Sequence, residues 1–472
     1  MNNRDLTKGK ILNGLLYMSI PAMVGMMSHT IYDLVDMMWI GRLSADAIAA
    51  ITLFSSIYFI VFVLNNIIGN GSVAVLSQAF GSKDEELAKA AMINTFTFKL
   101  IVGVVAAIIL FFTIKPLLLL FTKDTSLIES ALAYGRIRIL FLPIAFSSFT
   151  VITTLRCSGD SKNPMKINIF TSILNIVLDP IFIFEEIPII GIRGLGFGIA
   201  GAAMATVIST TISLVVSSYI MFGPKSKYKL KISDLFKINK QIVMKITKIG
   251  IPQATSGLIQ NLANLIMVGF VTAYGTLAIA AWGIIGRLFG FFTMPLGGLT
   301  QGGSAMVGQN IGAAKMDRAE EVGLTATKLG LISMAIVAGV SFIFMPNIIS
   351  IFTTNQEVIR LGSSALRAAI FCLPIFATGF GLSTLFGGSG YTVPFLYAAI
   401  IGQWVIQIPL MFLVTKVLDL SFPWLAGTYI FYALGQTLVS IYFYKKGKWR
   451  KKALEEIEIS KNKLREATSE VD

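Results

Sequence analysis

Long apolar stretches, separated by short polar connections, follow one another along almost the whole chain. Each is about 20 residues or longer, which is enough to cross the hydrocarbon core of a bilayer as a helix. The pattern therefore predicts an all-α polytopic membrane protein with twelve transmembrane helices. The predicted spans are 13–40, 47–79, 90–113, 132–156, 165–184, 196–222, 243–271, 277–308, 322–345, 361–387, 394–416 and 423–444.

Short residue groups recur at a constant offset of 231 positions, which indicates an internal duplication. The paired groups include Ile20-Pro21 with Ile251-Pro252, Ala47-Ile48-Ala49-Ala50 with Ala278-Ile279-Ala280-Ala281, Leu142-Pro143 with Leu373-Pro374, and Ser158-Gly159 with Ser389-Gly390. Six spans fall in each copy, and because six is even, both copies enter the membrane from the same side. We therefore expect two six-helix lobes related by pseudo-twofold symmetry about the membrane normal, as in many secondary transporters.

Domain boundaries and orientation follow from the connections between the spans. We expect an amino-terminal lobe at 1–222, a basic linker at 223–242, a carboxyl-terminal lobe at 243–445 and a tail at 446–472. Most Lys and Arg residues lie in the termini, the linker and the even-to-odd helix connections, so the positive-inside rule places both termini in the cytoplasm. Anionic membrane lipid is the natural partner of these basic faces.

The composition excludes several other classes of protein. Only 14% of the residues are charged, 55% are apolar and the mean hydropathy is +0.75, whereas a soluble domain carries about 25% charged residues. The net charge of +14 follows the loop asymmetry, so we expect no nucleic-acid partner. Two isolated cysteines give neither a disulfide framework nor a metal site. We expect no enzymatic activity, no cofactor other than a coupling ion, and a monomer.

The first span carries three ionisable residues on one helix face. His29, Asp33 and Asp36 are spaced i, i+4 and i+7, and Tyr32 flanks them. Two acids one turn apart in a low dielectric cannot both ionise cheaply, so we expect one of them to hold a proton near neutral pH, as a proton carrier must. Asp33 could instead lie in wet headgroups at the helix end, and His29 could line an aqueous cavity rather than partner Asp33.

A second polar pair lies in the fifth span. Asn175 and Asp179 are one turn apart, and Pro180 frees the backbone carbonyl of residue 176. These oxygens could hold a small cation or a proton network, unless the motif is only a kink at the helix end. Pro21 offers a bend in the first helix. The stretch Gly297-Gly298-Leu299-Thr300-Gln301-Gly302-Gly303 predicts close helix packing rather than a phosphate loop.

These motifs resemble the multidrug and toxic compound extrusion (MATE) family over about residues 10–445. The first group is Ile20-Pro21, Leu34-Val35-Asp36, Gly41-Arg42-Leu43, Ala49-Ala50 and Gln78-x-x-Gly81. The second is Arg156-x-x-Gly159-Asp160, Pro164, Asn175-x-x-x-Asp179-Pro180 and Gly198-x-Ala200-Gly201-Ala202-Ala203-x-Ala205-Thr206. The resemblance implies a two-lobe exporter that exchanges protons or sodium ions for amphipathic, often cationic drugs.

Within the family, the chain is similar to the DNA-damage-inducible-F-like (DinF) branch. That likeness implies a coupling site at Asp36, Asn175, Asp179 and Thr206, able to take H⁺ or Na⁺, with Pro21 as the bending proline. It also implies a substrate cavity that includes Tyr32, Tyr134 and Gln260. The other large bacterial branch has an acid where this chain has Gln260, so a carboxyl-lobe cation site is not expected. Asp33 departs from the family pattern.

The sequence therefore favours a cation-coupled antiporter that exports drugs across the cytoplasmic membrane. A flippase for lipid-linked oligosaccharides or lipids is the alternative, but only Lys99 and Arg287 could hold a pyrophosphate within the spans. An intramembrane enzyme that binds magnesium-pyrophosphate through the acids is a further alternative, although such enzymes do not predict a repeat of six plus six helices.

Overall fold

The computed structural model describes residues 4–188, 191–224 and 238–455. Helices make up this part of the chain, and its β-structure is limited to one isolated bridge between Glu186 and Arg193. Ten helices are long and apolar enough to cross a membrane, or eleven when α4 (Thr125–Leu140) and α5 (Leu142–Cys157) are taken as one bent span. The all-α polytopic prediction is confirmed. The twelfth predicted span coincides with α16 (Phe422–Lys445).

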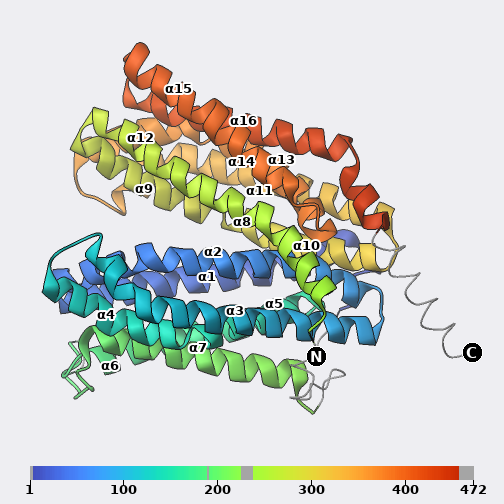
Figure 1. The fold of residues 1–472 in the computed structure, drawn as a ribbon. Coiled ribbons are helices and arrows are strands. Elements are labelled where there is room, and N and C mark those ends of the chain that lie inside the picture. Colours follow the sequence, from blue (N-terminus) through green and yellow to red (C-terminus); the bar gives the residue numbers. More distant parts are fainter. Residues whose placement is uncertain (1–3, 189–190, 225–237, 456–472) are drawn as a thin grey trace, which may run out of the picture. The chain divides into compact units, whose positions relative to one another are not determined.

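The described residues form two compact units (Figure 1). Among the described residues, unit 1 comprises Arg4, 24–80 and 84–248, and unit 2 comprises 5–23, 81–83 and 249–455. Most of each copy of the repeat lies in its own unit. The main exception is α1 (Ile11–Leu43), whose first part packs in unit 2 although we expected it in the amino-terminal lobe. Residues 81–83 also belong to unit 2, and the first part of α8 (Lys240–Val271), up to Lys248, belongs to unit 1. Most of the basic linker and the end of the tail lie outside the described residues.

Unit 1 is a bundle in which α7 takes a central place. The helix packs against α4, α5 and α6, and α3 packs against α4 and α5. The elements are α2 (Ala45–Gly81), α3 (Glu85–Leu119), α4, α5, α6 (Lys162–Ile183), α7 (Gly198–Phe222) and the second part of α1. A Cβ on Gly201 would lie 2.3 Å from the carbonyl oxygen of Phe182, so the glycine is what allows α6 and α7 to approach closely.

Unit 2 is built around α13, which packs against α10, α11 and α16. The other elements are α8 (Lys240–Val271), η2 (Thr272–Tyr274), α9 (Thr276–Phe292), α10 (Met294–Gly312), α11 (Met316–Ser350), α12 (Gln356–Ala369), α13 (Cys372–Ser389), α14 (Val393–Ala399), η3 (Ile400–Gln407), α15 (Ile408–Phe412), η4 (Leu413–Val417) and α16. After a turn at 446–447, residues 448–455 form a further helix with Trp449 buried, so this part of the predicted tail belongs to the unit.

The duplication is visible in local structure at the predicted offset. Asp124 and Asn355 both cap their helices by accepting hydrogen bonds from the second and third backbone N–H groups that follow. The guanidinium of Arg136 lies 5.8 Å from the centre of the Phe111 ring, and that of Arg367 lies 5.6 Å from Phe342. Each of these residue pairs is 231 positions apart, so the two copies use the same helix-start chemistry and the same cation–π contacts.

The glycine stretch of α10 packs closely against the first part of α1, as predicted. A Cβ on Gly298 would lie 2.8 Å from the Cβ of Met23, and one on Gly302 would lie 2.8 Å from the backbone of Met18 and Ser19. Small residues four positions apart let two helix backbones meet, which is the usual packing of membrane helices.

We expect Gly302→Ala to lower the free energy of unfolding of the protein by about 1–3 kcal/mol, because the added methyl group meets backbone atoms that cannot move aside. The midpoint of thermal unfolding in detergent measures this loss. Gly283→Ala in α9 is the matched control, since a Cβ there meets nothing within 4 Å. Equal midpoints for the two variants would contradict the packing argument.

Candidate coupling site

Two carboxyl groups from different helices of unit 1 meet in a hydrogen bond. Asp36 on α1 is half-buried, Asp179 on α6 is fully buried, and their side chains are hydrogen-bonded to each other. The other oxygen of Asp36, Oδ1, is buried without a hydrogen-bond partner among the described residues. Two carboxyls can share a hydrogen bond only when one of them carries a proton, so this pair is a place where a proton is held.

The amide of Asn175 connects this pair to α7. Oriented to satisfy both neighbours, its nitrogen donates to Asp179 Oδ2 at 2.9 Å and its oxygen accepts from the backbone N–H of Thr206 at 3.2 Å. The Thr206 hydroxyl donates to the carbonyl of Ala202 at 3.0 Å. The structure thus brings together the four predicted site residues. In this orientation the amide N–H of Asn175, rather than its oxygen, points toward Asp179. This arrangement suits a bound proton better than a metal cation, which needs oxygen ligands.

The charge of a basic residue, Arg138, also acts on this pair through Asp36. The sequence did not assign this residue to the site. The guanidinium of Arg138 on α4 lies 5.6 Å from the ring centre of Tyr58 and 6.0 Å from that of Tyr134, and its charge acts on Asp36. Tyr134 is buried and packs edge-on against Phe54. The sequence signal for Arg138 was its position one turn after Tyr134, on the same helix face.

His29 and Asp33 of the first helix form an exposed pair. His29 Nδ1 lies 3.1 Å from Asp33 Oδ2, with 68% and 58% of the two side chains exposed. Tyr32, half-buried, packs edge-on against the His29 ring at 5.2 Å between centres. His29 and Asp33 are therefore in contact with each other, and most of each side chain is exposed.

We expect Asp33→Asn and His29→Gln each to change gradient-driven transport by less than about threefold, because an exposed pair contributes little free energy. Initial rates of transport in vesicles, with both variants at matched protein content, measure this. A loss as large as that of an Asp36 variant would show that the exposed pair takes part in coupling.

Unit 2 holds two buried amides close in sequence to the positions that correspond to Asn175 and Asp179 in the repeat. Gln403 and Gln407 are buried and spaced like Asn175 and Asp179, and they lie in the π-helix η3, just before Pro409. Gln407 has neither amide atom hydrogen-bonded among the described residues. Gln260, on α8 of the same unit, donates to the Ser256 hydroxyl at 3.2 Å. These positions of unit 2 therefore carry amide side chains, which do not ionise.

The two basic residues considered for a flippase have different surroundings. Lys99 on α3 is fully buried, and its ammonium nitrogen lies 4.6 Å from the centre of the Phe149 ring without a hydrogen-bond acceptor among the described residues. Arg287 is exposed on α9 of unit 2. Among the described residues no group of three or more His, Cys, Asp or Glu side chains could hold a metal ion.

Comparison with known proteins agrees with this geometry. The family model described as MatE matches the chain twice, at residues 21–181 and 252–413, at nearly the same offset as the repeat. The chain belongs to the MATE family. Each match covers one copy of the duplicated unit, so the family model and the internal repeat mark the same boundaries.

Relatives of this MATE-family chain resemble it over nearly its full length. It is 29% identical over 457 residues to the probable multidrug resistance protein YoeA of Bacillus subtilis, covering 95% of this chain and 96% of the relative. It is 26% identical over 425 residues to the multidrug export protein MepA of Staphylococcus aureus, covering 88% and 89%.

Solved structures show the same fold. A multidrug resistance MATE family transporter of the MOP superfamily in an outward-facing conformation superimposes with a TM-score of 0.83 at 25% identity, over 95% of this chain and 98% of that one. A MOP superfamily transporter from Pyrococcus furiosus, described as having a binding pocket of reverse polarity, gives a TM-score of 0.84 at 25% identity, over 96% and 99%.

Proposed function

We propose that this chain is a proton-coupled antiporter that exports amphipathic, often cationic drugs across the cytoplasmic membrane. The observation that carries the proposal is the hydrogen-bonded pair of carboxyls, Asp36 and Asp179, inside a membrane bundle. Such a pair binds one proton and releases it when its surroundings change, which is the requirement for a coupling site. The full-length relatives named for multidrug resistance and export supply the substrate class.

The surroundings of the pair favour a proton over a sodium ion. Asn175 directs an N–H group toward Asp179, and the positive charge of Arg138 acts on Asp36. Both features repel a metal cation, whereas a shared proton needs no further oxygen ligands. The site resembles that of the DinF branch, and sodium remains the alternative coupling ion that an experiment must distinguish.

In the proposed cycle, a proton from outside is taken up while drug is released outward, and its release to the cytoplasm resets the site. Protonation removes one negative charge from unit 1, so the helix that bears Asp36 experiences a different field in the two states. Pro21 lies within the same helix, two residues before its passage from unit 2 to unit 1 at Met23–Val24. A proline removes one helical hydrogen bond, which makes that point the natural place for a bend.

The function is tested in vesicles that contain the purified protein and a fluorescent cationic drug. We expect an imposed pH gradient to drive drug movement and a sodium gradient at uniform pH to drive none. Equal drive by the sodium gradient would overturn proton coupling and retain drug export. No movement under either gradient, with the drug shown to bind, would overturn the antiport proposal.

A further inference from the structure

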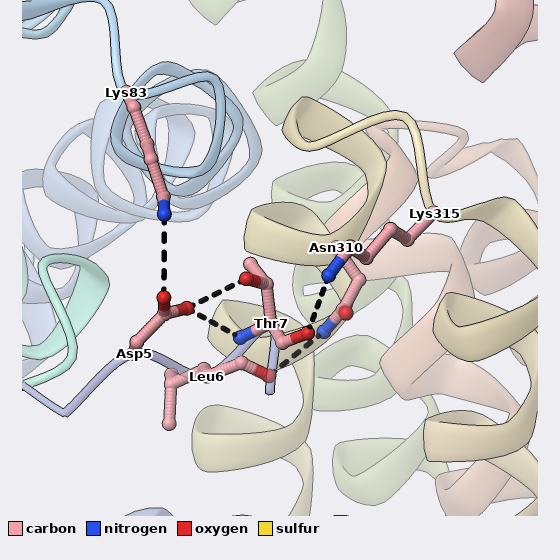
Figure 2. A network of polar contacts seen from close by, with 6 residues as sticks. All are labelled: Asp5, Leu6, Thr7, Lys83, Asn310 and Lys315. Atoms are coloured by element: carbon pink, nitrogen blue, oxygen red, sulfur yellow. Dashed lines mark hydrogen bonds and ion pairs between the residues drawn. The ribbon is translucent and has the colours of Figure 1, made fainter. Parts of the chain in front are cut away.

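Side chains of α10, of α11 and of the connection between them bind four consecutive carbonyl groups of the segment that precedes the first helix. Asn310 Nδ2 donates to the carbonyl of Leu6 at 3.3 Å, and Lys315 Nζ donates to that of Thr7 at 2.9 Å (Figure 2). One guanidinium nitrogen of Arg318 donates to the carbonyls of Lys8 and Gly9, at 3.0 and 2.8 Å. Carbonyls just before a helix have no partners within it, so three side chains of unit 2 supply every one of these hydrogen bonds.

The same segment, residues 5–10, is held by its side chains as well. Leu6 is 1% exposed and belongs to the apolar core of unit 2. The Asp5 carboxylate accepts from the Thr7 hydroxyl at 2.6 Å and pairs with Lys83 Nζ at 3.3 Å, and Figure 2 shows both groups directed at it. The hydrogen bond from Thr7 holds the pKa of the Asp5 carboxyl below its ordinary value, so the carboxylate is ionised throughout the neutral range.

These contacts continue into the start of the helix. Leu15 and Met18 are fully buried in the core of unit 2, and a Cβ on Gly14 would lie 2.9 Å from the terminal methyl of Met306. The helix joins unit 1 only from Val24 onward, and it then carries Asp36. One uninterrupted helix is therefore fixed at its beginning in one unit and bears the coupling acid in the other.

We infer that Asn310, Lys315 and Arg318 are positioning residues for coupling: they hold the start of the first helix on unit 2 throughout the cycle, so that events at Asp36 act on unit 2 through this helix. The inference rests on the proposed function, since it needs Asp36 to be the coupling acid. With its start held, the helix can rearrange only beyond Pro21, and a change at Asp36 is transmitted to unit 2. If the start of the helix were free, residues 5–20 would move in response to the change at Asp36. The change would then not reach unit 2, and no drug would be transported.

The double variant Lys315→Ala with Arg318→Ala tests this in vesicles. Loss of three charge-assisted hydrogen bonds is expected to lower gradient-driven drug export about tenfold or more, while the KM for drug stays unchanged and proton uptake continues. The number of protons taken up for each drug molecule therefore rises. Arg450→Ala is the matched control: it removes a cation that pairs with Asp317 and Glu320 of the same helix α11, and its coupling ratio should equal that of the wild type.

A second variant keeps the test independent of folding. Asp5→Cys with Lys83→Cys, joined by a short thiol-reactive cross-linker, replaces the exposed ion pair by a covalent bond. The two native cysteines are buried. Because the segment is proposed to stay in place throughout the cycle, the cross-linked protein should transport at the rate of the reagent-treated single variants. Arrest of transport by the cross-link would overturn the inference, because it would show that the segment must detach.

The outcomes separate this inference from the proposed function. A normal coupling ratio in the double variant, with Asp36→Asn inactive, would overturn the positioning role and leave the coupling site intact. Full transport by Asp36→Asn would overturn the proposed function, whatever the double variant does.

Discussion

Asp36→Asn is expected to reduce proton-driven export to about 1% of the wild-type rate or less, because the acid–acid pair loses the member that we propose exchanges its proton. Asparagine keeps the size and the hydrogen bond to Asp179 but cannot ionise. Binding of the drug should remain, since no charge change is needed for it in this scheme. The rate of drug movement under an imposed pH gradient and the Kd of the drug for the purified variant measure the two properties.

The matched control is Asp46→Asn, which neutralises an exposed acid in the first turn of α2 in the same unit. It should transport at the wild-type rate, because an exposed acid at a helix start contributes only to local stability. Wild-type transport by Asp36→Asn would contradict the coupling role. Loss of drug binding together with transport would show that Asp36 is needed by the substrate rather than by the proton.

The fold could be predicted from the sequence because its main determinants are local. The length of each apolar stretch predicts a membrane span, and the constant offset predicts the duplication. The helix caps at Asp124 and Asn355, which make the same hydrogen bonds, agree with this duplication. The bend could not be predicted in the same way. We took 132–156 as one span, whereas α4 and α5 meet at Phe141 with a bend of 51°, just before Pro143. Hydropathy is nearly constant across such a bend, so apolar length does not reveal it.

The residues of the candidate site that lie in family motifs could be named from the sequence. The residue whose place depends on tertiary packing, Arg138, could not. Asp36, Asn175 and Asp179 stand out because an ionisable or amide group within an apolar span needs a reason. Arg138 did not stand out, because a long side chain near a helix end usually reaches toward the interface. Its guanidinium instead lies over the rings of Tyr58 and Tyr134, and its charge acts on Asp36. This position of the guanidinium depends on how α4 packs against other helices.

The segment before the first helix illustrates a different limit. Residues 5–10 carry no hydrophobic pattern, and their role lies in backbone carbonyls that every residue possesses. Their partners Asn310, Lys315 and Arg318 lie about 300 residues further along the chain, at the end of α10 and the start of α11. Nothing in the sequence distinguishes these three residues from other polar residues near a helix end. Recognition of backbone by side chains leaves no mark in a single sequence.

Arg138 provides the second large expected effect, because its positive charge acts on Asp36, one member of the acid pair. A cation beside a carboxyl stabilises the ionised form by an amount that corresponds to about 1–3 pH units. Its removal makes the pair hold a proton more firmly, so release requires a higher pH. The direction of the change is therefore fixed by the sign of the charge alone.

Arg138→Met keeps the length of the side chain and removes the charge. We expect the pH dependence of drug export to shift toward higher pH by about 1–3 units, with the maximal rate retained at the shifted optimum. Arg136→Met is the matched control on the same helix, two residues away, where the guanidinium is exposed over Phe111 and the profile should not move. Initial rates measured at a series of pH values, with a constant pH difference across the membrane, give the midpoints. An unchanged midpoint in an active Arg138→Met variant, or a shift toward lower pH, would show that this guanidinium does not set the proton affinity of the pair.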